Sequence, residues 1–364
     1  MSALIRKLGP EAIRFLETVR RYGANPISAA RRYWALYRRR QFSPDEIHFQ
    51  RLLDPTLSET DLLRAVSKEE LLAVQARLNP LALHARTEDK IEFNRFCREN
   101  QLPVPDIFAL YDRGQSQRAG DIPQIKDVNG LDTFLCSTHT DSFILKPVAG
   151  VNGEGVMRLE RHEGQWRDTH GAAFDAPKLL DTMTRTPYAR WLFQRVVRGH
   201  PALAALSNTT GLQTVRVVTV VDRANRVCIL AARLRLICGD VAHDNFEFGK
   251  TGNVIAILNP ENGRIESAVG GSSARYEMQP VTRHPRTGHE LIGFEVPDWP
   301  AVRELAIGAA QKFMPLRSIG WDVAVTPETP TLIEGNVTWA TLSGEARMGD
   351  IYRGLCELAD TLRG

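Results

Sequence analysis

Two short strand-like segments near the C-terminus constrain the fold of this chain more than any other feature. Residues 320–325 (Gly-Trp-Asp-Val-Ala-Val) and 331–336 (Thr-Leu-Ile-Glu-Gly-Asn) flank a Pro-Glu-Thr-Pro turn that folds the second segment back beside the first. Asp322, Glu334 and Asn336 then converge. Carboxylate and amide oxygens hold hard cations such as Mg²⁺, so the hairpin predicts half of a nucleotide–metal site. The alternative is a strand pair that ends in turn-stabilising polar residues.

A hairpin with several glycines predicts the phosphate-binding half of such a site. An apolar run ends at Lys146, and a second apolar run begins at Val156. The loop between them contains Gly150, Gly153 and Gly155. Glycines let backbone N–H groups approach phosphate oxygens, and the lysine adds a positive charge. The loop matches neither a Walker loop nor a dinucleotide fingerprint. Taken alone, it also fits an ordinary hairpin turn.

The lysine, the glycine hairpin and the downstream Asp and Glu-x-Asn residues together resemble the ATP-grasp superfamily of ligases. Asp89-Lys90 at the start of a helix and the Leu-Pro-Val-Pro segment at 102–105 also resemble landmarks of that family. Residues 191–197 resemble its hinge strand, whose backbone contacts adenine. Among ATP-grasp groups, the spacing is most similar to the sugar-transfer-associated family. The resemblance covers residues 45–345.

This resemblance implies an α+β ATP-grasp fold, in which two subdomains clamp ATP. Ser-x-x-Glu capping boxes begin at Ser43 and Ser67, so we expect residues 1–86 to be a basic helical extension. Residues 87–195 would form the N-terminal part of the fold, with the lysine helix and the glycine hairpin. Residues 196–364 would form the C-terminal subdomain with the metal site. The many strand segments that follow the extension agree with an α+β class.

The resemblance also implies roles for individual residues. The predicted nucleotide-binding set is Lys90, Lys146, Gly150, Gly153, Gly155, Gln194, Val196 and Val197. The predicted metal-binding set is Asp322, Glu334 and Asn336, in which Glu334 would bridge two Mg²⁺ ions. A solvated helix lysine is the plainer interpretation of Lys90, and a buried strand is the plainer interpretation of the hinge.

Three arginines on two neighbouring strand segments are the candidate catalytic residues: Arg216, Arg233 and Arg235. A planar guanidinium group binds a carboxylate or phosphate through two hydrogen bonds, which suits a substrate acid and its acylphosphate. The alternative for each is a cross-strand ion pair. Gly320 stands where many superfamily members have an arginine, so we expect one of the three to replace it. Gln194 likewise stands in place of a glutamate.

Two further segments have two interpretations each. His200 either replaces a ribose-binding acid that is missing after the hinge or lies in solvent. The polar loop at 244–252 either shapes the acceptor site or is a plain surface loop.

Composition is ordinary for a globular chain with two or three domains. The chain has 364 residues, of which 43% are hydrophobic and 24% are charged. We find no apolar run near the roughly 18 residues that span a bilayer and no secretory signal. The five cysteines are scattered, which predicts neither a disulfide framework nor a zinc site and favours a cytoplasmic location.

Positive charge is concentrated at the N-terminus. Residues 1–40 carry ten Arg or Lys against two Glu, a net charge of +8 in a chain whose total is +3. Asn25-Pro26 separates two amphipathic helices, the second with Ile27, Ala30, Trp34 and Tyr37 on one stripe. We prefer the interpretation that both helices pack on the core and keep their arginines in water. The alternative is attraction to an anionic membrane or an acidic substrate. The small total charge argues against nucleic-acid binding.

The function that the resemblance implies is an ATP-dependent carboxylate–amine ligase. ATP with Mg²⁺ would convert a substrate carboxylate to an acylphosphate, and an amine would displace phosphate to give an amide. In the narrower family, the substrate would be a sugar acid, an amino sugar or an amino acid for a surface polysaccharide. The alternatives are a non-catalytic ATP-binding scaffold of a glycan-assembly complex and a small-molecule kinase on the same fold. The sequence leaves the acid, the amine, the pathway and the oligomeric state open.

Overall fold

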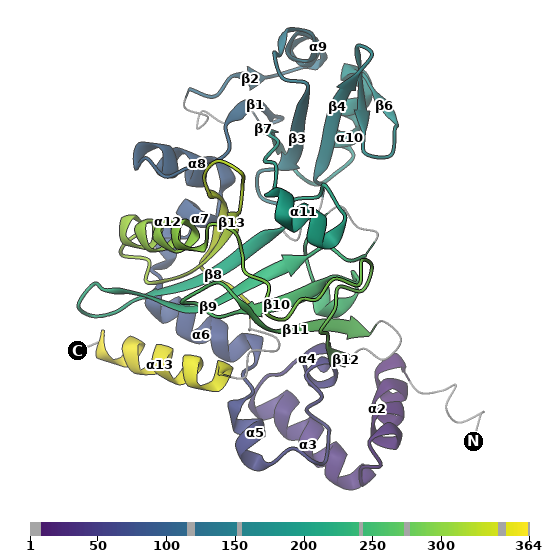
Figure 1. Ribbon diagram of the computed structural model, residues 1–364, viewed down its shortest axis with the longest axis vertical. Coiled ribbons are helices and arrows are strands. Elements are labelled where there is room, and N and C mark those ends of the chain that lie inside the picture. The colour runs from purple at the N-terminus through teal and green to yellow at the C-terminus, as the bar shows by residue number, and fades with distance from the viewer. Residues whose placement is uncertain are drawn as a thin grey trace.

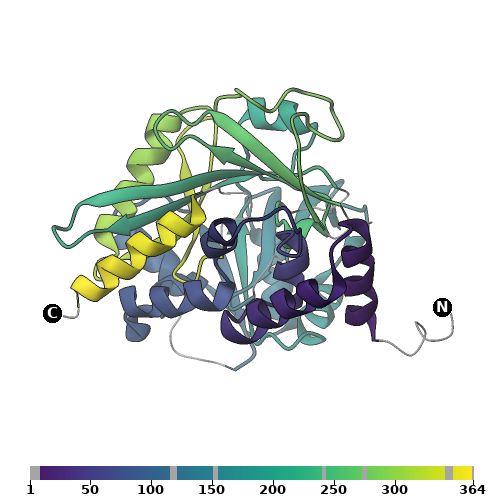
Figure 2. The same cartoon turned by 90° about the horizontal axis from the view of Figure 1, so that it is seen from below.

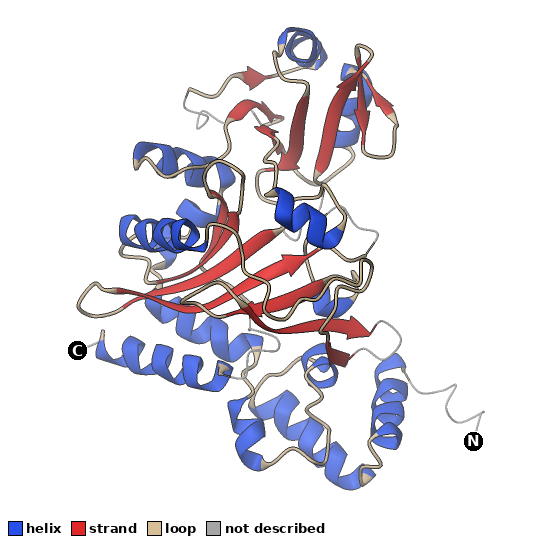
Figure 3. Ribbon diagram, in the orientation of Figure 1, coloured by secondary structure: helices blue, strands red, loops and turns tan. Residues whose placement is uncertain are grey.

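The computed structural model describes residues 9–114, 121–150, 155–239, 243–272, 277–340 and 347–362. Within these ranges the chain forms two sheets, helices that pack on them, and a group of helices at the N-terminal end (Figures 1 and 3). The predicted α+β class is therefore confirmed. None of the helices in these ranges is long and apolar enough to cross a membrane.

Sheet A has seven strands in the order β2-β1-β7-β3-β4-β5-β6. They are β1 (Ile107–Asp112), β2 (Gln124–Ile125), β3 (Ser142–Pro147), β4 (Met157–His162), β5 (Gln165–Asp168), β6 (Ala173–Phe174) and β7 (Arg190–Arg195). Helices α9 (Val128–Ser137) and α10 (Ala176–Thr184) cover one face through apolar side chains such as Leu131 and Leu179. The opposite face contacts Ile91 of α8 (Lys90–Glu99) through Leu192. Lys146 lies directly opposite Leu192 in the antiparallel pairing of β3 with β7, so the lysine side chain is on this second face of the sheet.

Sheet B also has seven strands, in the order β12-β11-β10-β9-β8-β13-β14. They are β8 (Thr214–Val221), β9 (Val227–Leu236), β10 (Val254–Leu258), β11 (Ile265–Ser272), β12 (Glu277–Pro280), β13 (Ser318–Ala324) and β14 (Thr331–Asn336). Strand β8 is apolar on both faces because both faces are covered. Val215 and Val217 pack toward α12 (Trp299–Lys312), whereas Val218 and Val220 pack toward α6 (Lys68–Leu78) and α13 (Met348–Thr361).

The remaining helices are short or belong to the N-terminal group. That group contains α2 (Pro10–Arg21), α3 (Pro26–Arg39), α4 (Pro44–Phe49) and α5 (Glu59–Arg64). The others are η1 (Leu81–Leu83), α7 (Ala85–Glu88), α11 (Pro201–Ser207) and η2 (Glu247–Gly249). The N-terminal group has its own apolar cluster around Phe42 and Ile47. It also contacts the edge of sheet B, where Arg21 and Tyr22 both bond to Glu277.

Local start signals in the sequence identify three helix starts correctly. The capping boxes at Ser43 and Ser67 are both present, and Asn25 caps α3 by accepting from the N–H groups of Ile27 and Ser28. A third box at Ser58, completed by an aspartate instead of a glutamate, was not predicted.

Helix α3 packs as expected, but not through the predicted stripe. Ile27, Trp34 and Tyr37 of α3 are 66%, 59% and 43% exposed, so the predicted stripe faces solvent instead of the core. The helix buries its opposite side instead, through Ala29 and Leu36.

Candidate active site

The hairpin predicted near the C-terminus is present, and its polar residues share one face. Strand β13 pairs antiparallel with β14, with Asp322 opposite Glu334 and Gly320 opposite Asn336. Residues that lie directly opposite each other in an antiparallel pair point to the same side of the sheet. The three predicted oxygen donors therefore lie next to one another.

Asp322 is bound by two arginines. Arg216 donates from Nε to Oδ1, and from Nη2 to Oδ2 at 2.8 Å. Arg235 donates to the same two oxygens at 3.1 and 3.2 Å. Burial raises the pKa of Asp322, but the two guanidinium groups outweigh burial and hold the pKa far below its usual range. Four hydrogen bonds use the roughly four lone-pair positions of a carboxylate, so Asp322 would coordinate a cation only by releasing an arginine.

Glu334 and Asn336 fit a divalent cation better than Asp322 does. Desolvation and the adjacent Asp322 carboxylate raise the pKa of Glu334, and Arg216 and Lys146 oppose that rise. A bound cation would relieve this repulsion between two neighbouring carboxylates. Asn336 donates from its amide nitrogen toward the Gly320 carbonyl at 3.4 Å and Glu334 Oε1 at 3.5 Å. Both contacts leave the amide oxygen as a possible ligand.

Arg216 occupies the space beside Gly320. A Cβ atom built on Gly320 would lie 2.9 Å from Cβ of Trp339 and 3.1 Å from Cδ of Arg216. The approach to Trp339 is inside 3.0 Å, which real Cβ atoms essentially never show, and the approach to Arg216 is also tight, so position 320 has no room for an arginine while these two residues are in place. Of the three arginines proposed from the sequence to replace it, Arg216 is thus the one next to the glycine.

The other two predicted arginines lie on the same face of sheet B. Arg233 is directly opposite Arg216 in the β8–β9 pairing and is 6% exposed. Arg235 lies 3.7 Å from Asp244, whose carboxylate also accepts from the backbone N–H and hydroxyl of Thr214 at 2.8 and 2.5 Å. The loop at 244–252 is therefore tied to the arginine cluster through Asp244.

The two predicted lysines come from the sheet A side of the site. Lys90 donates from Nζ to the carbonyls of Val148 and Gly150, at 3.2 and 2.6 Å. Desolvation lowers the pKa of Lys90, although Glu334 opposes the shift. Lys146 is 8% exposed, and burial together with Lys90 lowers its pKa to about 8. Electrostatic interactions with Glu334 connect both lysines to the carboxylates of sheet B.

The remaining predicted nucleotide-binding residues lie along β7 and the β3–β4 loop. Gln194 is buried in β7 between Ile107 and Ile144, and Val196 and Val197 are half-buried just beyond the strand. Gly155 has φ +72°, and a Cβ there would lie 3.1 Å from both Pro147 and Trp191, so glycine is required on both grounds. Gly150 contributes its carbonyl to Lys90, and Gly153 lies outside the described residues.

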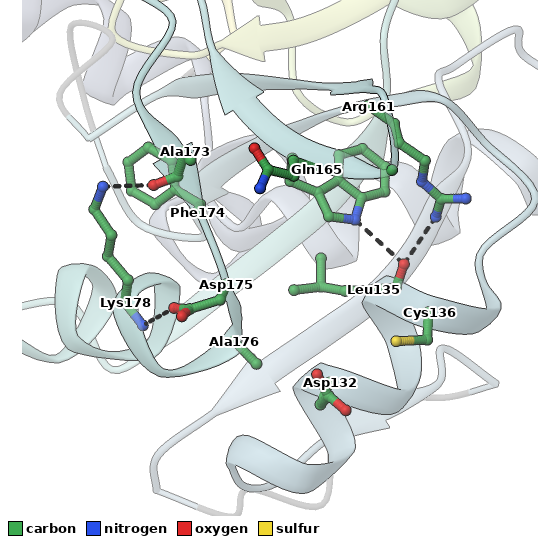
Figure 4. Close-up of a pocket in the computed structure, with 12 residues that line it drawn as sticks. Asp132, Leu135, Cys136, Arg161, Gln165, Ala173, Phe174, Asp175, Ala176 and Lys178 are labelled. Atoms are coloured by element: carbon green, nitrogen blue, oxygen red, sulfur yellow. Dashed lines mark hydrogen bonds between the residues drawn. The ribbon is translucent and has the colours of Figure 1, made fainter.

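Neither of two surface cavities in the described part of the chain is lined by a predicted site residue. The larger, about 550 Å³, lies in the sheet A lobe between α9, β5 and α10 and contains none of the predicted site residues (Figure 4). A second cavity, about 410 Å³, is lined by Asp89 and Arg190, which pair at 2.6 Å. Asp89 also caps α8 through the N–H groups of Ile91 and Glu92, and so fixes the start of the helix that carries Lys90.

The structure gives His200 a local role at a helix start. Its Nδ1 accepts from the Ala202 N–H at 3.2 Å, which caps α11. Two ion pairs near the site were not predicted. Asp244 is a partner of Arg235, and Arg190 is a partner of Asp89. An acidic residue shortly after an arginine-bearing strand could have indicated Asp244, whereas nothing local indicates Arg190.

Comparisons with known proteins identify the fold. A model of the sugar-transfer associated ATP-grasp family matches residues 73–346. Comparison with curated protein sequences found no relative. The family match confirms the ATP-grasp fold expected from the sequence.

Several solved structures are distantly similar. A biotin carboxylase–βγ-ATP complex from Campylobacter jejuni is 12% identical, with 76% of this chain and 46% of that chain covered and a TM-score of 0.44. The biotin carboxylase domain of 2-oxoglutarate carboxylase from Hydrogenobacter thermophilus, in complex with MgADP, is 11% identical, with 75% and 45% covered and a TM-score of 0.41. D-alanine–D-alanine ligase from Helicobacter pylori is 11% identical, with 76% and 61% covered and a TM-score of 0.42. The chain thus spans about half to three-fifths of the length of these proteins.

Proposed function

Because the chain belongs to the sugar-transfer associated ATP-grasp family, we propose that it is an ATP-dependent carboxylate–amine ligase with ATP and Mg²⁺ as cofactors. One observation carries the proposal. Glu334 interacts electrostatically with Lys90 and Lys146 from the sheet A side and with Arg216 and Arg235 from sheet B. The proposed phosphate-binding cations and the proposed metal-binding carboxylate therefore belong to one charge network, which suits a magnesium–nucleotide complex.

The nucleotide side of the proposed site consists of Lys90 and Lys146 with Glu334 and Asn336. Mg²⁺ held by Glu334 and Asn336 would neutralise charge on the phosphates. Lys146 supplies a positive charge from sheet A. Lys90 holds the β3–β4 loop through two backbone carbonyls and so fixes that loop beside the phosphates. Gln194 and the residues after it are the proposed contacts of adenine.

The acceptor side of the site consists of the arginine cluster. In the proposed reaction a substrate carboxylate oxygen attacks the γ-phosphorus of ATP, and the bond between that phosphorus and the bridging oxygen breaks to release ADP. An amine nitrogen then attacks the acylphosphate carbon and displaces phosphate, leaving an amide once the nitrogen has lost a proton. Arg216, Arg233 and Arg235 provide positive charge for the carboxylate and the acylphosphate, with Asp322 orienting the first and the third.

The substrate class is a finer proposal. The family description supports an acid or amine connected with sugar transfer, so we propose a sugar acid, an amino sugar or an amino acid that becomes part of a surface polysaccharide.

A trapping experiment tests the reaction type. The protein is incubated with ATP, Mg²⁺ and a panel of carboxylates, with hydroxylamine in place of the unknown amine. A ligase of this kind gives a hydroxamate and ADP that depend on the acid. A product that retains a stable phosphoryl group, seen by mass spectrometry, would identify a kinase instead. ATP binding without turnover on any acid–amine pair would support the scaffold alternative.

A binding measurement tests the metal assignment independently of turnover. Mg²⁺ with ADP should raise the melting temperature of the wild-type protein, and Glu334→Gln should reduce that rise. The matched control is Glu304→Gln on the exposed surface of α12, which should leave the rise in melting temperature unchanged. An equal rise in the Glu334 variant would remove Glu334 from the metal site.

A further inference from the structure

Helix α3 presents an apolar and aromatic stripe to solvent. Ile27, Trp34 and Tyr37 recur at helical spacing and are 66%, 59% and 43% exposed. The opposite side of the helix is already buried through Ala29 and Leu36. The exposed stripe is therefore additional to the side of α3 that packs on its own domain.

The exposure of Trp34 is unusual within this chain. The other five tryptophans are at most 5% exposed: Trp166, Trp191, Trp299, Trp321 and Trp339. Tryptophan carries a large apolar surface, and exposed clusters of such residues mark binding surfaces. Trp34 thus points to a partner that covers α3.

Every charged residue of α3 itself is positive. Helix α3 contains four arginines and no acidic residue. Arg31 and Arg38 are exposed beside the stripe, and the Arg38 guanidinium lies 4.9 Å from the Trp34 ring centroid. Within the described ranges, neither Arg31 nor Arg38 has a carboxylate at salt-bridge distance, whereas Arg14 and Arg40 pair with Glu11 and Glu70. The arginines beside the aromatic stripe therefore have charge available for an anionic partner.

The position of α3 leaves this face accessible. Figure 1 places α3 at the end of the molecule opposite α9 and the sheet A lobe, and Figure 2 shows α2 and α3 from that end. The described residues of the proposed active site belong to the other parts of the molecule. A flat surface can cover α3 without contacting sheet A.

We propose that this face of α3 docks on a bilayer surface rich in anionic lipids. An interfacial helix needs a polar face with Lys or Arg and an apolar face with residues such as Trp, Phe or Leu. In α3 the rings of Trp34 and Tyr37 enter the headgroup region with Ile27, and Arg31 and Arg38 pair with lipid phosphates. A bilayer is favoured over an acidic protein because the face is a single exposed helix stripe with aromatic residues and arginines interleaved. The contact is peripheral and involves no residue of the proposed active site.

Sedimentation of the full chain with vesicles tests the electrostatic part. The protein should bind vesicles that contain phosphatidylglycerol much more strongly than vesicles of phosphatidylcholine alone, and salt should weaken that binding. Each basic residue near an anionic surface is worth roughly five-fold in partitioning, so R31Q/R38Q should weaken binding roughly 25-fold. The control R185Q/R223Q makes the same charge change at exposed positions far along the chain, and it should bind like the wild type.

Tryptophan fluorescence tests the apolar part. Because Trp34 is the one exposed tryptophan of the six, vesicles should shift its emission to shorter wavelength, and brominated lipids should quench it. Trp34→Ala should weaken binding roughly ten-fold. Leu63→Ala on α5, at a residue that is 75% exposed, should have no effect.

Three results would overturn the proposal. These are equal sedimentation with neutral and anionic vesicles, equal loss of binding in the R185Q/R223Q control, and binding to anionic vesicles without a change in Trp34 emission. Retention on an immobilised polyanion such as heparin without any vesicle binding would replace the bilayer with a macromolecular polyanion.

Discussion

Lys146 should make nucleotide affinity depend on pH. Burial and the neighbouring Lys90 lower the pKa of Lys146 from 10.5 to about 8. One pKa unit corresponds to about 1.4 kcal/mol, so keeping this side chain protonated at neutral pH costs the unliganded protein roughly 3 kcal/mol. A bound phosphate would offset that cost by pairing with the ammonium group and raising its pKa toward the ordinary value.

The direction of the effect follows from proton linkage. As pH rises above about 8, the unliganded protein loses the Lys146 proton, whereas the nucleotide complex retains it. Binding must then take up a proton, so affinity falls as pH rises. The protonated fraction of Lys146 drops roughly eight-fold between about pH 7.5 and about pH 9, so the dissociation constant for ATP should rise roughly eight-fold over that interval. In the unfolded chain Lys146 keeps its proton up to its ordinary pKa of 10.5. Between about pH 8 and pH 10.5 the unfolded chain therefore binds more protons than the folded protein, so the unliganded protein becomes more stable as pH rises.

Calorimetric titration of ATP in the presence of Mg²⁺ measures this dependence directly. Lys146→Arg should flatten the profile, because a guanidinium group stays charged throughout the range. Lys90→Arg is the control and should retain the slope. A flat wild-type profile would refute the assignment of a low pKa to Lys146. A slope that persists in Lys146→Arg and disappears in Lys90→Arg would assign the titration to Lys90.

Three further substitutions test the packing and charge around the site. Asp322→Asn removes the negative charge that pairs with Arg216 and Arg235, so the free energy of unfolding should fall by about 3–5 kcal/mol in urea titrations. An unchanged free energy of unfolding would show that the two arginines find other partners. Gly320→Ala should cost about 1–3 kcal/mol through overpacking, whereas the helical control Gly308→Ala, with no atom within 4 Å of its Cβ, should be neutral or stabilising in the same thermal melts. Phe49→Ala removes the aromatic support of the loop at 244–252 and should raise KM for the acceptor acid several-fold with little change in ATP affinity; an equal effect on both would mean that Phe49 serves general stability.

Local patterns in the sequence predict the β13–β14 hairpin and several helix starts, because both depend on residues close together in the chain. Asp322 and Glu334 are separated by one short turn, and the capping boxes at Ser43 and Ser67 depend on a serine and a glutamate three residues apart. The donors of the predicted metal site therefore converge as expected.

Contacts that depend on the order of strands in sheet B could not be predicted in the same way. Arg216 reaches Asp322 across 106 positions of sequence, because β8 is the neighbour of β13. The sequence identifies three arginines of suitable chemistry but not which one lies next to Gly320. Asp244 enters the same network from the loop after β9, and its place beside Arg235 depends on the path of that loop in space.

Helix α3 shows a different limit. Its periodicity correctly groups Ile27 with Trp34 and Tyr37, but Ala29 and Leu36 form a second apolar stripe on the same helix. A helix with two apolar sides has no internal preference for either one. Packing against the cluster around Phe42 and Ile47 determines which side of α3 is buried, because Leu36 belongs to that cluster.

The N-terminal helices are in direct contact with the acceptor side of the proposed active site. Phe49 of α4 packs with its ring centroid 5.6 Å from that of Phe246 and 5.4 Å from that of Phe248. The same loop contains Asp244, which lies beside Arg235 in the arginine cluster. Since α3 and α4 share one apolar cluster, a surface that holds α3 would also hold the support of this loop in place. The extension would then orient the acceptor side toward the bilayer. Lys146 of sheet A and Lys90 of α8, which bind the nucleotide in the proposed reaction, would lie on the far side of the site.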